Sequence, residues 1–168
     1  MELKEKLGPI NWQFMPTKAF DPADFEAFLK LLPRSVDGVA IRHAVEVRHD
    51  SFRTPDFIAL LRAYGVAAIT AGDSDYPQIG DVTAPFVYAR IMGTQEDEPE
   101  GYPDAALGRW VQRALDWSHG KVPGDLARIS TDAAEAGPRD VFLYVISGAK
   151  VRNPAAAIAL TRRLANSD

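Results

Sequence analysis

Acidic and basic side chains interrupt an apolar, strand-like run at residues 43–49, which reads His-Ala-Val-Glu-Val-Arg-His. Because side chains of a strand alternate between its two faces, Glu46 and Arg48 point the same way and the valines point the other. A later apolar run repeats this arrangement with Tyr88 and Arg90. A carboxylate can serve as a general base, and a guanidinium group can hold an anion with paired N–H donors. The two runs therefore predict a functional site.

Five apolar strand-like runs alternate with helix-like patterns along the chain, an order typical of parallel βα units. The expected strands are residues 8–14, 43–49, 66–71, 86–92 and 141–146. Polar residues stand at or just beyond the carboxyl ends of these runs, namely Gln13, Glu46, Arg48, His49, Asp73, Arg90 and Ser147. Active sites of parallel α/β proteins lie beyond such strand ends, so we expect these side chains to share one pocket.

Helix-like patterns with recognisable start signals connect the strands. Asp21 and Thr54 each precede a proline and are expected to cap helices, the second of which ends at Gly65. Asn153 is expected to open the last helix by the same rule. The core-facing residues expected there are Ala157, Ile158, Leu160 and Leu164. Residues 118–140 are rich in Gly, Pro and charge, which predicts a surface excursion.

The composition favours a single globular domain over residues 1–168, since 46% hydrophobic and 25% charged residues are ordinary values. A net charge of −4 argues against nucleic acid as a partner. The absence of cysteine excludes disulfides and thiolate zinc sites. Residues 1–6 lack the apolar core of a signal peptide, and no run approaches the roughly 20 apolar residues of a membrane span. A cytoplasmic protein without a membrane partner is therefore expected.

Three residues of the expected pocket are candidates for catalysis. Glu46 and Asp73 would act as general base or nucleophile, because neighbouring guanidinium groups hold carboxylates ionised. His49 lies just past its strand and is either a general base or a residue that caps the following loop. A divalent ion between the two carboxylates is disfavoured by the nearby arginines, and the three histidines are scattered. The sequence therefore predicts no metal site and no cofactor.

Five residues are candidates for substrate binding. Arg48 and Arg90 would hold a phosphate or carboxylate, with Gln13 and Tyr88 beside them. Lys150 precedes the last helix, where it could bind an anion together with the helix N–H groups. The implied partner is a small anionic molecule. An alternative interpretation is purely structural, because the same acids and arginines could form an ion-pair network that fills the interior.

Short motifs follow one another in a fixed order along the chain. They are residues 7–9 with Gln13 and Phe14, then residues 43–49, then Tyr88 with Arg90 and Gly93. This order resembles the YecE-like family, also called domain of unknown function 72. The resemblance implies a TIM-type βα barrel of unassigned activity, in which these motifs belong to strands four to eight. A complete eight-unit barrel takes roughly 250 residues, so a partial barrel with a parallel sheet is expected here.

Two positions depart from the pattern of that family. Met92 stands where the family usually has a histidine before the glycine, which removes a candidate acid, base or ligand. The segment Ile146-Ser147-Gly148 replaces an aromatic-Asn-Asn end of the last strand, which removes amide groups from the mouth. The resemblance therefore implies a mouth whose polar groups differ from those of its relatives.

The sequence predicts an enzyme domain that acts on a small anionic or sugar-like compound. Two other interpretations stay open: a non-enzymatic domain that binds a ligand or partner in the same pocket, and an inactive truncated remnant. A five-strand piece exposes two unpaired sheet edges and apolar surface, which favours association. We therefore expect the isolated chain to self-associate unless another segment supplies the absent strands.

Overall fold

The computed structural model describes residue 3 and residues 6–167. The expectation about a signal peptide therefore rests largely on residues outside the described part. The strands are β1 (Ile10–Gln13), β2 (Ser35–Val36), β3 (Val39–Ala40), β4 (His43–Glu46), β5 (Ala67–Gly72), β6 (Phe86–Ile91) and β7 (Asp140–Val145). The helices are α1 (Pro22–Leu31), α2 (Pro55–Tyr64), α3 (Asp104–Ser118) and α4 (Asn153–Ala165), with 3-10 turns η2 (Asp50–Phe52) and η3 (Lys150–Arg152).

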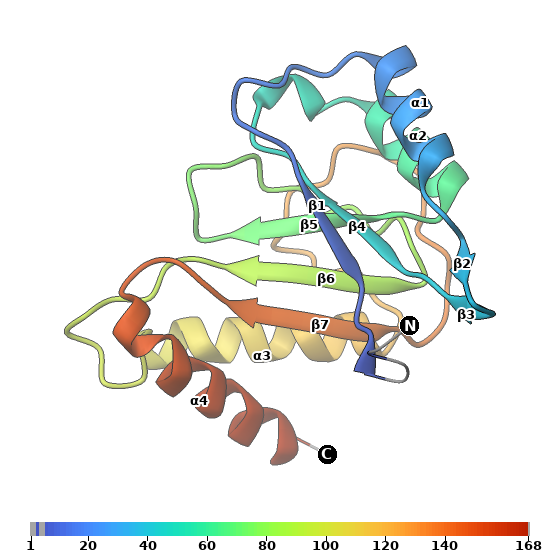
Figure 1. Ribbon diagram of the computed structural model, residues 1–168. Helices are drawn as coiled ribbons and strands as arrows, with labels where there is room; N and C mark the ends of the chain where they lie inside the picture. Colours follow the sequence, from blue (N-terminus) through green and yellow to red (C-terminus); the bar gives the residue numbers. More distant parts are fainter. Residues whose placement is uncertain (1–2, 4–5, 168) are drawn as a thin grey trace.

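Five parallel strands form one sheet in the order β1-β4-β5-β6-β7, and the sheet curls into a half-barrel (Figure 1). The α/β class, the parallel pairing and the approximate position of each strand are as predicted. A two-stranded antiparallel hairpin of β2 and β3, which the sequence did not predict, projects at the amino end of β4. Because all five strands run the same way, their carboxyl ends lie along one rim.

The first two long helices begin where their cap signals predict. The side chain of Asp21 accepts a hydrogen bond from the amide of Asp24, and that of Thr54 accepts one from Phe57. Gly65 ends α2 in the left-handed conformation, with φ of 65°, which glycine adopts without steric cost. These local signals confirm the predicted start of both helices and the predicted end of α2.

The last helix differs from its prediction in two ways. Turn η3 runs directly into α4, so Asn153 is not a cap; its Oδ1 instead accepts a hydrogen bond from the hydroxyl of Thr94. Ile158 is 68% exposed and Ala157 is also exposed. The residues of α4 that are buried are Ala156, Ala159 and Leu160. The apolar stripe is therefore rotated by one position, because Ala156 and Leu160 are four residues apart and set the packed face.

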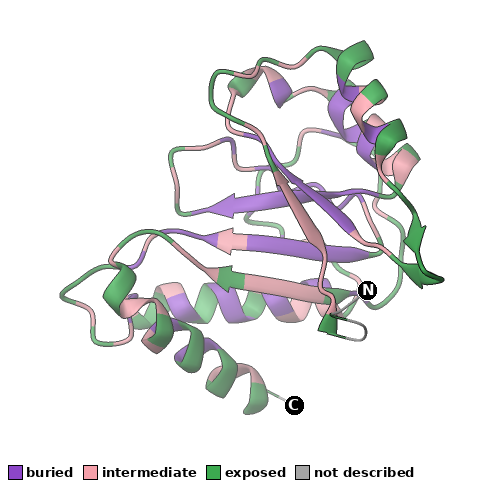
Figure 2. Cartoon of the chain, in the orientation of Figure 1, coloured by how far each residue is buried: buried purple, intermediate pink, exposed green. Residues whose placement is uncertain are grey.

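Two hydrophobic layers lie between the sheet and its helices. Figure 2 shows buried residues on the strands and on the helices that cover them. Trp110 and Trp117 of α3 are each 1% exposed in the layer beneath β6 and β7. Trp12 faces the other layer. Its ring packs edge-on against the ring of Phe28 in α1, with the ring centroids 5.6 Å apart. All three tryptophans thus pack between the sheet and its helices. No helix in the described part of the chain is long and apolar enough to cross a membrane.

The segment that follows α3 has no helix or strand between residue 119 and residue 139. It is nevertheless anchored, because the carboxylate of Asp81 accepts hydrogen bonds from the amides of Ile129 and Ser130 at 2.7 and 3.0 Å. Leu126 is only 4% exposed and joins the layer under β6 and β7. The segment therefore supplies packing as well as surface.

Candidate functional site

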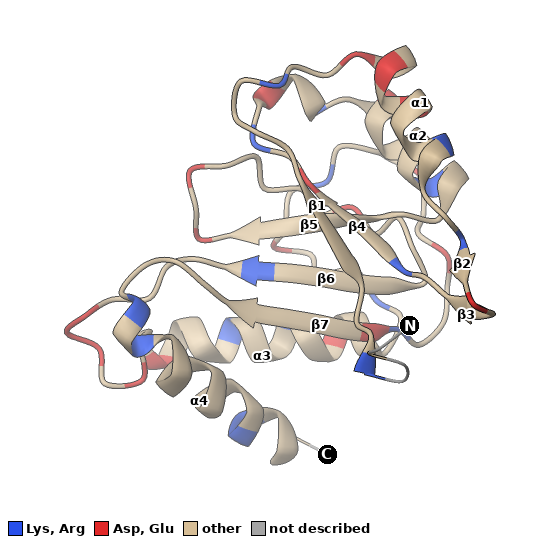
Figure 3. Cartoon of the chain, viewed as in Figure 1, with Lys and Arg blue, Asp and Glu red and all other residues tan. Residues whose placement is uncertain are grey.

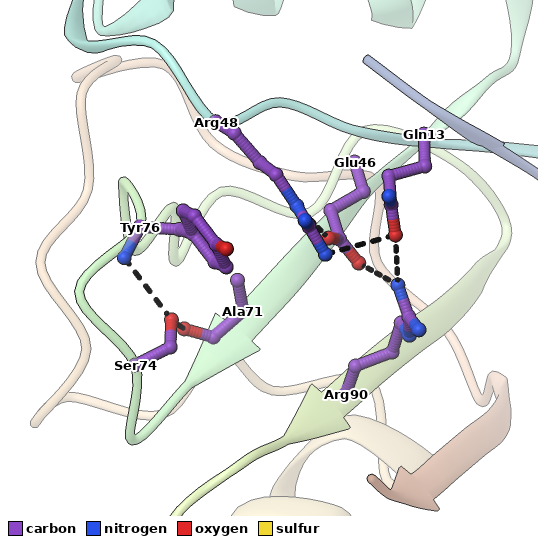
Figure 4. Close-up of polar contacts among 7 residues, drawn as sticks. All are labelled: Gln13, Glu46, Arg48, Ala71, Ser74, Tyr76 and Arg90. Atoms are coloured by element: carbon purple, nitrogen blue, oxygen red, sulfur yellow. Dashed lines mark hydrogen bonds and ion pairs between the residues drawn. The ribbon is translucent and has the colours of Figure 1, made fainter. Parts of the chain in front are cut away.

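Side chains from three strands of the half-barrel meet at the carboxyl rim (Figure 4). Arg48, just beyond β4, donates from Nε to Oε1 of Glu46 at 2.8 Å and from Nη2 to Oε1 of Gln13 at 2.9 Å. Arg90 of β6 donates from Nη1 to the same Gln13 oxygen at 2.9 Å and also to Oε2 of Glu46. We call these four residues the rim cluster.

Strand register explains why residues distant in sequence reach one another. Gln13 and Glu46 are direct partners in the pairing of β1 with β4. Arg90 is paired with Ala71 of β5, the strand that separates β4 from β6. Because alanine is small, Ala71 leaves room for the side chains of Glu46 and Arg90 to meet above β5. The alternation that placed Glu46 and Arg48 on one face is thus seen in the structure.

The rim cluster holds more positive charge than negative charge. Glu46 is completely buried, whereas the side chains of Arg48 and Arg90 are 18% and 17% exposed. Both oxygens of the carboxylate accept from guanidinium groups, so one negative charge faces two positive ones. The ring of Tyr76 lies 4.2 Å from the guanidinium of Arg48 and holds it from the other side. The cluster therefore presents one excess positive charge to the rim.

Tyr88 lies on the same face of β6 as Arg90, one strand repeat deeper. Its side chain is 8% exposed and stacks on Tyr144 of β7, with ring centroids 5.0 Å apart. Burial is the largest cause that raises the pKa of the Tyr88 phenol, and the adjoining Tyr144 adds to this rise. Tyr88 is thus a protonated interior residue beneath the cluster rather than a residue at the rim.

Asp73 does not join the rim cluster, contrary to its expected convergence with the arginines. It follows β5 with a left-handed φ of 53°, and its Oδ2 accepts a hydrogen bond of 2.7 Å from Nε1 of Trp110 in α3. The hydroxyl of Tyr102 also interacts with this carboxylate and accepts a hydrogen bond from the amide of Gly93. Sequence alternation could not foresee this, because a residue in the left-handed conformation no longer follows the alternation of the strand.

A depression of about 500 Å³ adjoins the rim cluster. Its lining residues are Asp73, Ser74, Asp75, Tyr76, Met92 and Ser147. Tyr76 connects the two features, because it also contacts Arg48. Asp73 and Ser147 are two of the three non-glycine residues with positive φ in the described part of the chain, and the third lies in the β2–β3 turn. Conformations of this kind are costly and concentrate at functional sites.

Two further predicted residues lie apart from the cluster. His49 caps the turn η2, where its Nδ1 accepts a hydrogen bond of 3.2 Å from the amide of Ser51. This is the alternative, non-catalytic position considered for His49. Lys150 is exposed at the start of η3.

Tyr76 was missed by the sequence analysis, since an aromatic residue in an irregular loop follows no periodic pattern. Within residue 3 and residues 6–167, no three His, Cys, Asp or Glu side chains gather as metal ligands would.

A curled sheet of parallel strands, helices on its outer face and polar side chains at the carboxyl rim together define an α/β half-barrel protein. Residues 1–168 match the sequence model of the family described as "Protein of unknown function DUF72", and the chain belongs to that family. The resemblance to the YecE-like family, which is the same family, is therefore confirmed. The family description assigns no activity.

Solved structures of the family share this fold. A DUF72 family protein from Thermotoga maritima is 17% identical, with a TM-score of 0.65 over 98% of this chain and 60% of its own. Two structures of a DUF72 family protein from Enterococcus faecalis are 14% and 15% identical, with TM-scores of 0.62 and 0.65. They match 96% and 98% of this chain and 62% and 61% of their own. The chain thus spans about three-fifths of their length, and no curated protein matches it.

Proposed function

We propose that this chain forms strands four to eight of a TIM-type barrel and binds a small anionic or sugar-like compound at the carboxyl rim. The parallel strand order supports the barrel assignment, as does the match to three-fifths of longer family structures. Ligand sites of such barrels lie at the carboxyl ends of the strands, where the rim cluster and its neighbouring depression are found. The proposal thus places substrate binding on this part of the barrel.

The excess positive charge of the rim cluster is the observation that carries this proposal. Glu46 and Gln13 fix the orientation of the guanidinium groups of Arg48 and Arg90. Both bonds of Arg90 in the cluster come from Nη1, so its other N–H groups are directed elsewhere. A planar guanidinium fork matches two oxygens of a phosphate or carboxylate at once. The cluster is therefore suited to hold the anionic group of a ligand.

The two candidate carboxylates have different surroundings and receive different roles. Glu46 is enclosed and uses both oxygens on arginines, so we assign it to positioning rather than to proton transfer. Asp73 lines the depression, and hydrogen bonding to Trp110 holds its carboxylate in place. In an enzyme, Asp73 would be the general base acting on a hydroxyl of a compound whose anion rests on Arg48 and Arg90.

Ligand binding can be tested with a library of phosphorylated sugars and small carboxylates, read as a rise in the unfolding temperature. A ligand at 100 times its Kd stabilises the folded state by about 2.7 kcal/mol. Replacement Arg90→Ala should weaken binding of any hit by at least roughly tenfold, which corresponds to 1.4 kcal/mol. Arg109→Ala is the control, because it removes one positive charge from an exposed position of α3, outside the rim cluster. Equal binding by wild type and Arg90→Ala would refute the assignment.

Turnover of a hit then separates an enzyme from a binding domain. Asp73→Asn should abolish product formation while leaving the Kd of the ligand within about threefold, since Asp73 is not among the residues proposed to hold the anion. Product formed at the wild-type rate by this variant would exclude Asp73 as the base. Binding without any product would favour the non-enzymatic domain, and the absence of hits would favour the structural ion-pair network or an inactive remnant.

A further inference from the structure

The amino end of the half-barrel carries a second cavity, which the proposed function does not use. It has a volume of about 510 Å³ and is bordered by the last turns of α1 and α2 and the start of β4. Three basic residues line it: Lys30 of α1, Arg34 of the following loop and Arg62 of α2. Figure 3 shows basic residues on these neighbouring helix ends. The cavity thus gathers positive charge from three separate segments.

Carboxylates neutralise this charge only in part. Lys30 forms an ion pair of 3.1 Å with Glu26, in which both side chains are more than one-third exposed. Arg34 is exposed on the cavity wall, where its guanidinium group can meet a ligand. Tyr64 lies on the same cavity wall. The positive charge of Arg34 lowers the pKa of the Tyr64 phenol, against the larger rise caused by burial. A positive charge therefore stays available at the cavity.

Arg62 is held loosely and has an unused donor. Its Nη1 donates to the hydroxyl of Ser130 at 3.3 Å and its Nη2 to the carbonyl of Asp132 at 3.4 Å, both long distances for hydrogen bonds. Its ion pair with the Asp132 carboxylate is also long, at 3.8 Å, and that carboxylate is 83% exposed. Its Nε is buried and has no acceptor among the described residues. A buried guanidinium donor without an acceptor is costly, so a rotation of the Arg62 side chain that gives Nε a phosphate oxygen as its acceptor would be stabilising.

His43 forms a fixed part of the wall and supplies no free donor. Its Nδ1 accepts a hydrogen bond of 3.1 Å from Nε1 of Trp12, so the ring proton resides on Nε2, which lies 2.8 Å from the carbonyl oxygen of Pro33. The imidazole is thereby satisfied on both sides. Recognition of a ligand in this cavity falls to the three basic side chains.

We propose that this cavity binds a phosphorylated small molecule, whose phosphate oxygens contact Arg34, Arg62 and Lys30. Two guanidinium groups offer paired donors that fit phosphate oxygens, and the lysine adds a point charge. The volume exceeds that of one phosphate group, so the rest of the molecule is accommodated as well. This site is separate from the rim cluster, which lies at the other end of the strands.

Titration of the full chain with inorganic pyrophosphate, followed by calorimetry, tests this site. Arg34→Ala should raise the Kd by roughly tenfold or more, which corresponds to a loss of about 1.4 kcal/mol in binding free energy. Arg62→Lys, which keeps the charge but removes the fork and Nε, should also weaken binding. Arg109→Ala is the matched control, because it removes one positive charge from an exposed position of α3. Arg90→Ala reports on the rim cluster. Thermal unfolding of each variant verifies that it is folded.

Binding that is weakened by Arg34→Ala and Arg62→Lys but not by Arg109→Ala or Arg90→Ala would support the site. Equal losses in Arg34→Ala and Arg109→Ala would show attraction to net charge only and would overturn it. Loss in Arg90→Ala alone would place pyrophosphate at the rim and also overturn it. The absence of any binding would do the same.

Discussion

Glu46 is the residue on which the rim cluster depends. It is a fully buried carboxylate that accepts hydrogen bonds from two arginines, and each arginine also bonds to Gln13. Burying a charge is favourable only when it is paired and hydrogen bonded. The carboxylate in turn keeps two like-charged guanidinium groups close together. Stability and the proposed anion binding thus depend on the same side chain.

Replacement Glu46→Gln should lower the free energy of unfolding by about 3–5 kcal/mol, because it leaves two partly buried cations without a counter-charge. Urea denaturation measures this change. Asp125→Asn is the control. It breaks the ion pair between Arg113 and the Asp125 carboxylate, which is 48% exposed, and should lower the free energy of unfolding by about 1 kcal/mol or less. A loss of similar size in both variants would contradict a central role for Glu46.

Tyr102 should make stability depend on pH in alkaline solution. Burial raises the pKa of its phenol strongly, and the Asp73 carboxylate adds to the rise, although the Gly93 amide opposes it. Because the folded pKa exceeds the unfolded value of roughly 10, this contribution is complete below about pH 10 and is lost as the pH rises further. The free energy of unfolding, measured by urea denaturation, should fall between about pH 9 and pH 11. It should fall less over this range in Tyr102→Phe. A flat profile would contradict this.

Alternation along a strand was sufficient to predict the faces of Glu46, Arg48 and Arg90. It was not sufficient for Asp73, because a left-handed φ at the end of β5 turns that side chain to Trp110. Nor could it find Tyr76, whose contact with Arg48 comes from a loop. Residues inside regular strands are predictable from local pattern, whereas residues that follow the strand depend on the loop conformation.

Contacts between strands that are not neighbours hold the sheet in its curl. Gln13 of β1 and Glu46 of β4 both bond to Arg90 of β6 at the rim. At the opposite end, Arg42 donates to Asp140 of β7 at 2.7 Å, and its guanidinium lies 4.6 Å from the Phe142 ring centroid. The curl is therefore fixed from both ends of the concave face.

Replacement Ala71→Leu should disrupt the rim cluster by filling the space above β5. Overpacking of a core costs about 1–3 kcal/mol, and Ala71 is only 1% exposed. Ala68→Leu is the matched control, because Ala68 is also buried but packs in the layer with α1 and α2. We expect similar losses of stability from both variants and loss of anion binding only from Ala71→Leu, measured by calorimetry. Binding retained by Ala71→Leu would contradict the assigned geometry.

Elements with strong local signals were predicted well and those set by tertiary packing were not. The caps at Asp21 and Thr54 fixed the start of α1 and α2, because capping is a local interaction. The β2–β3 hairpin was missed, since strands of two residues carry no detectable alternation. The face of α4 was misplaced by one position, because a helix rich in alanine has a weak apolar stripe and packing decides its rotation.

Within the part of the chain that the structure describes, the half-barrel has two edge strands, β1 and β7. Apolar side chains near them are open to solvent, with Met15 69% and Tyr144 42% exposed. Unpaired parallel edges and exposed apolar groups favour pairing with further strands. A barrel assignment agrees with this, since a barrel leaves no strand edge.

We predict that the isolated chain self-associates, or is unstable, unless another segment pairs with β1 and β7. Light scattering after gel filtration should therefore show a mass above 18.4 kDa that rises with concentration. Lysine placed at the exposed edge position Tyr144 should reduce this association, because a charge on an edge strand disfavours pairing. A monomer that unfolds in one cooperative transition, with unchanged behaviour in Tyr144→Lys, would contradict the prediction.

We propose that Arg48 and Arg90 together hold the anionic group of a ligand. A crystal structure of the protein soaked with a sugar phosphate tests this proposal. We predict phosphate oxygens within about 2.7–2.9 Å of a nitrogen of each guanidinium group, the range for charged hydrogen bonds. A rim without phosphate, with the two arginines still bonded only to Glu46 and Gln13, would contradict the proposal, whether or not phosphate occupies the cavity at the amino end.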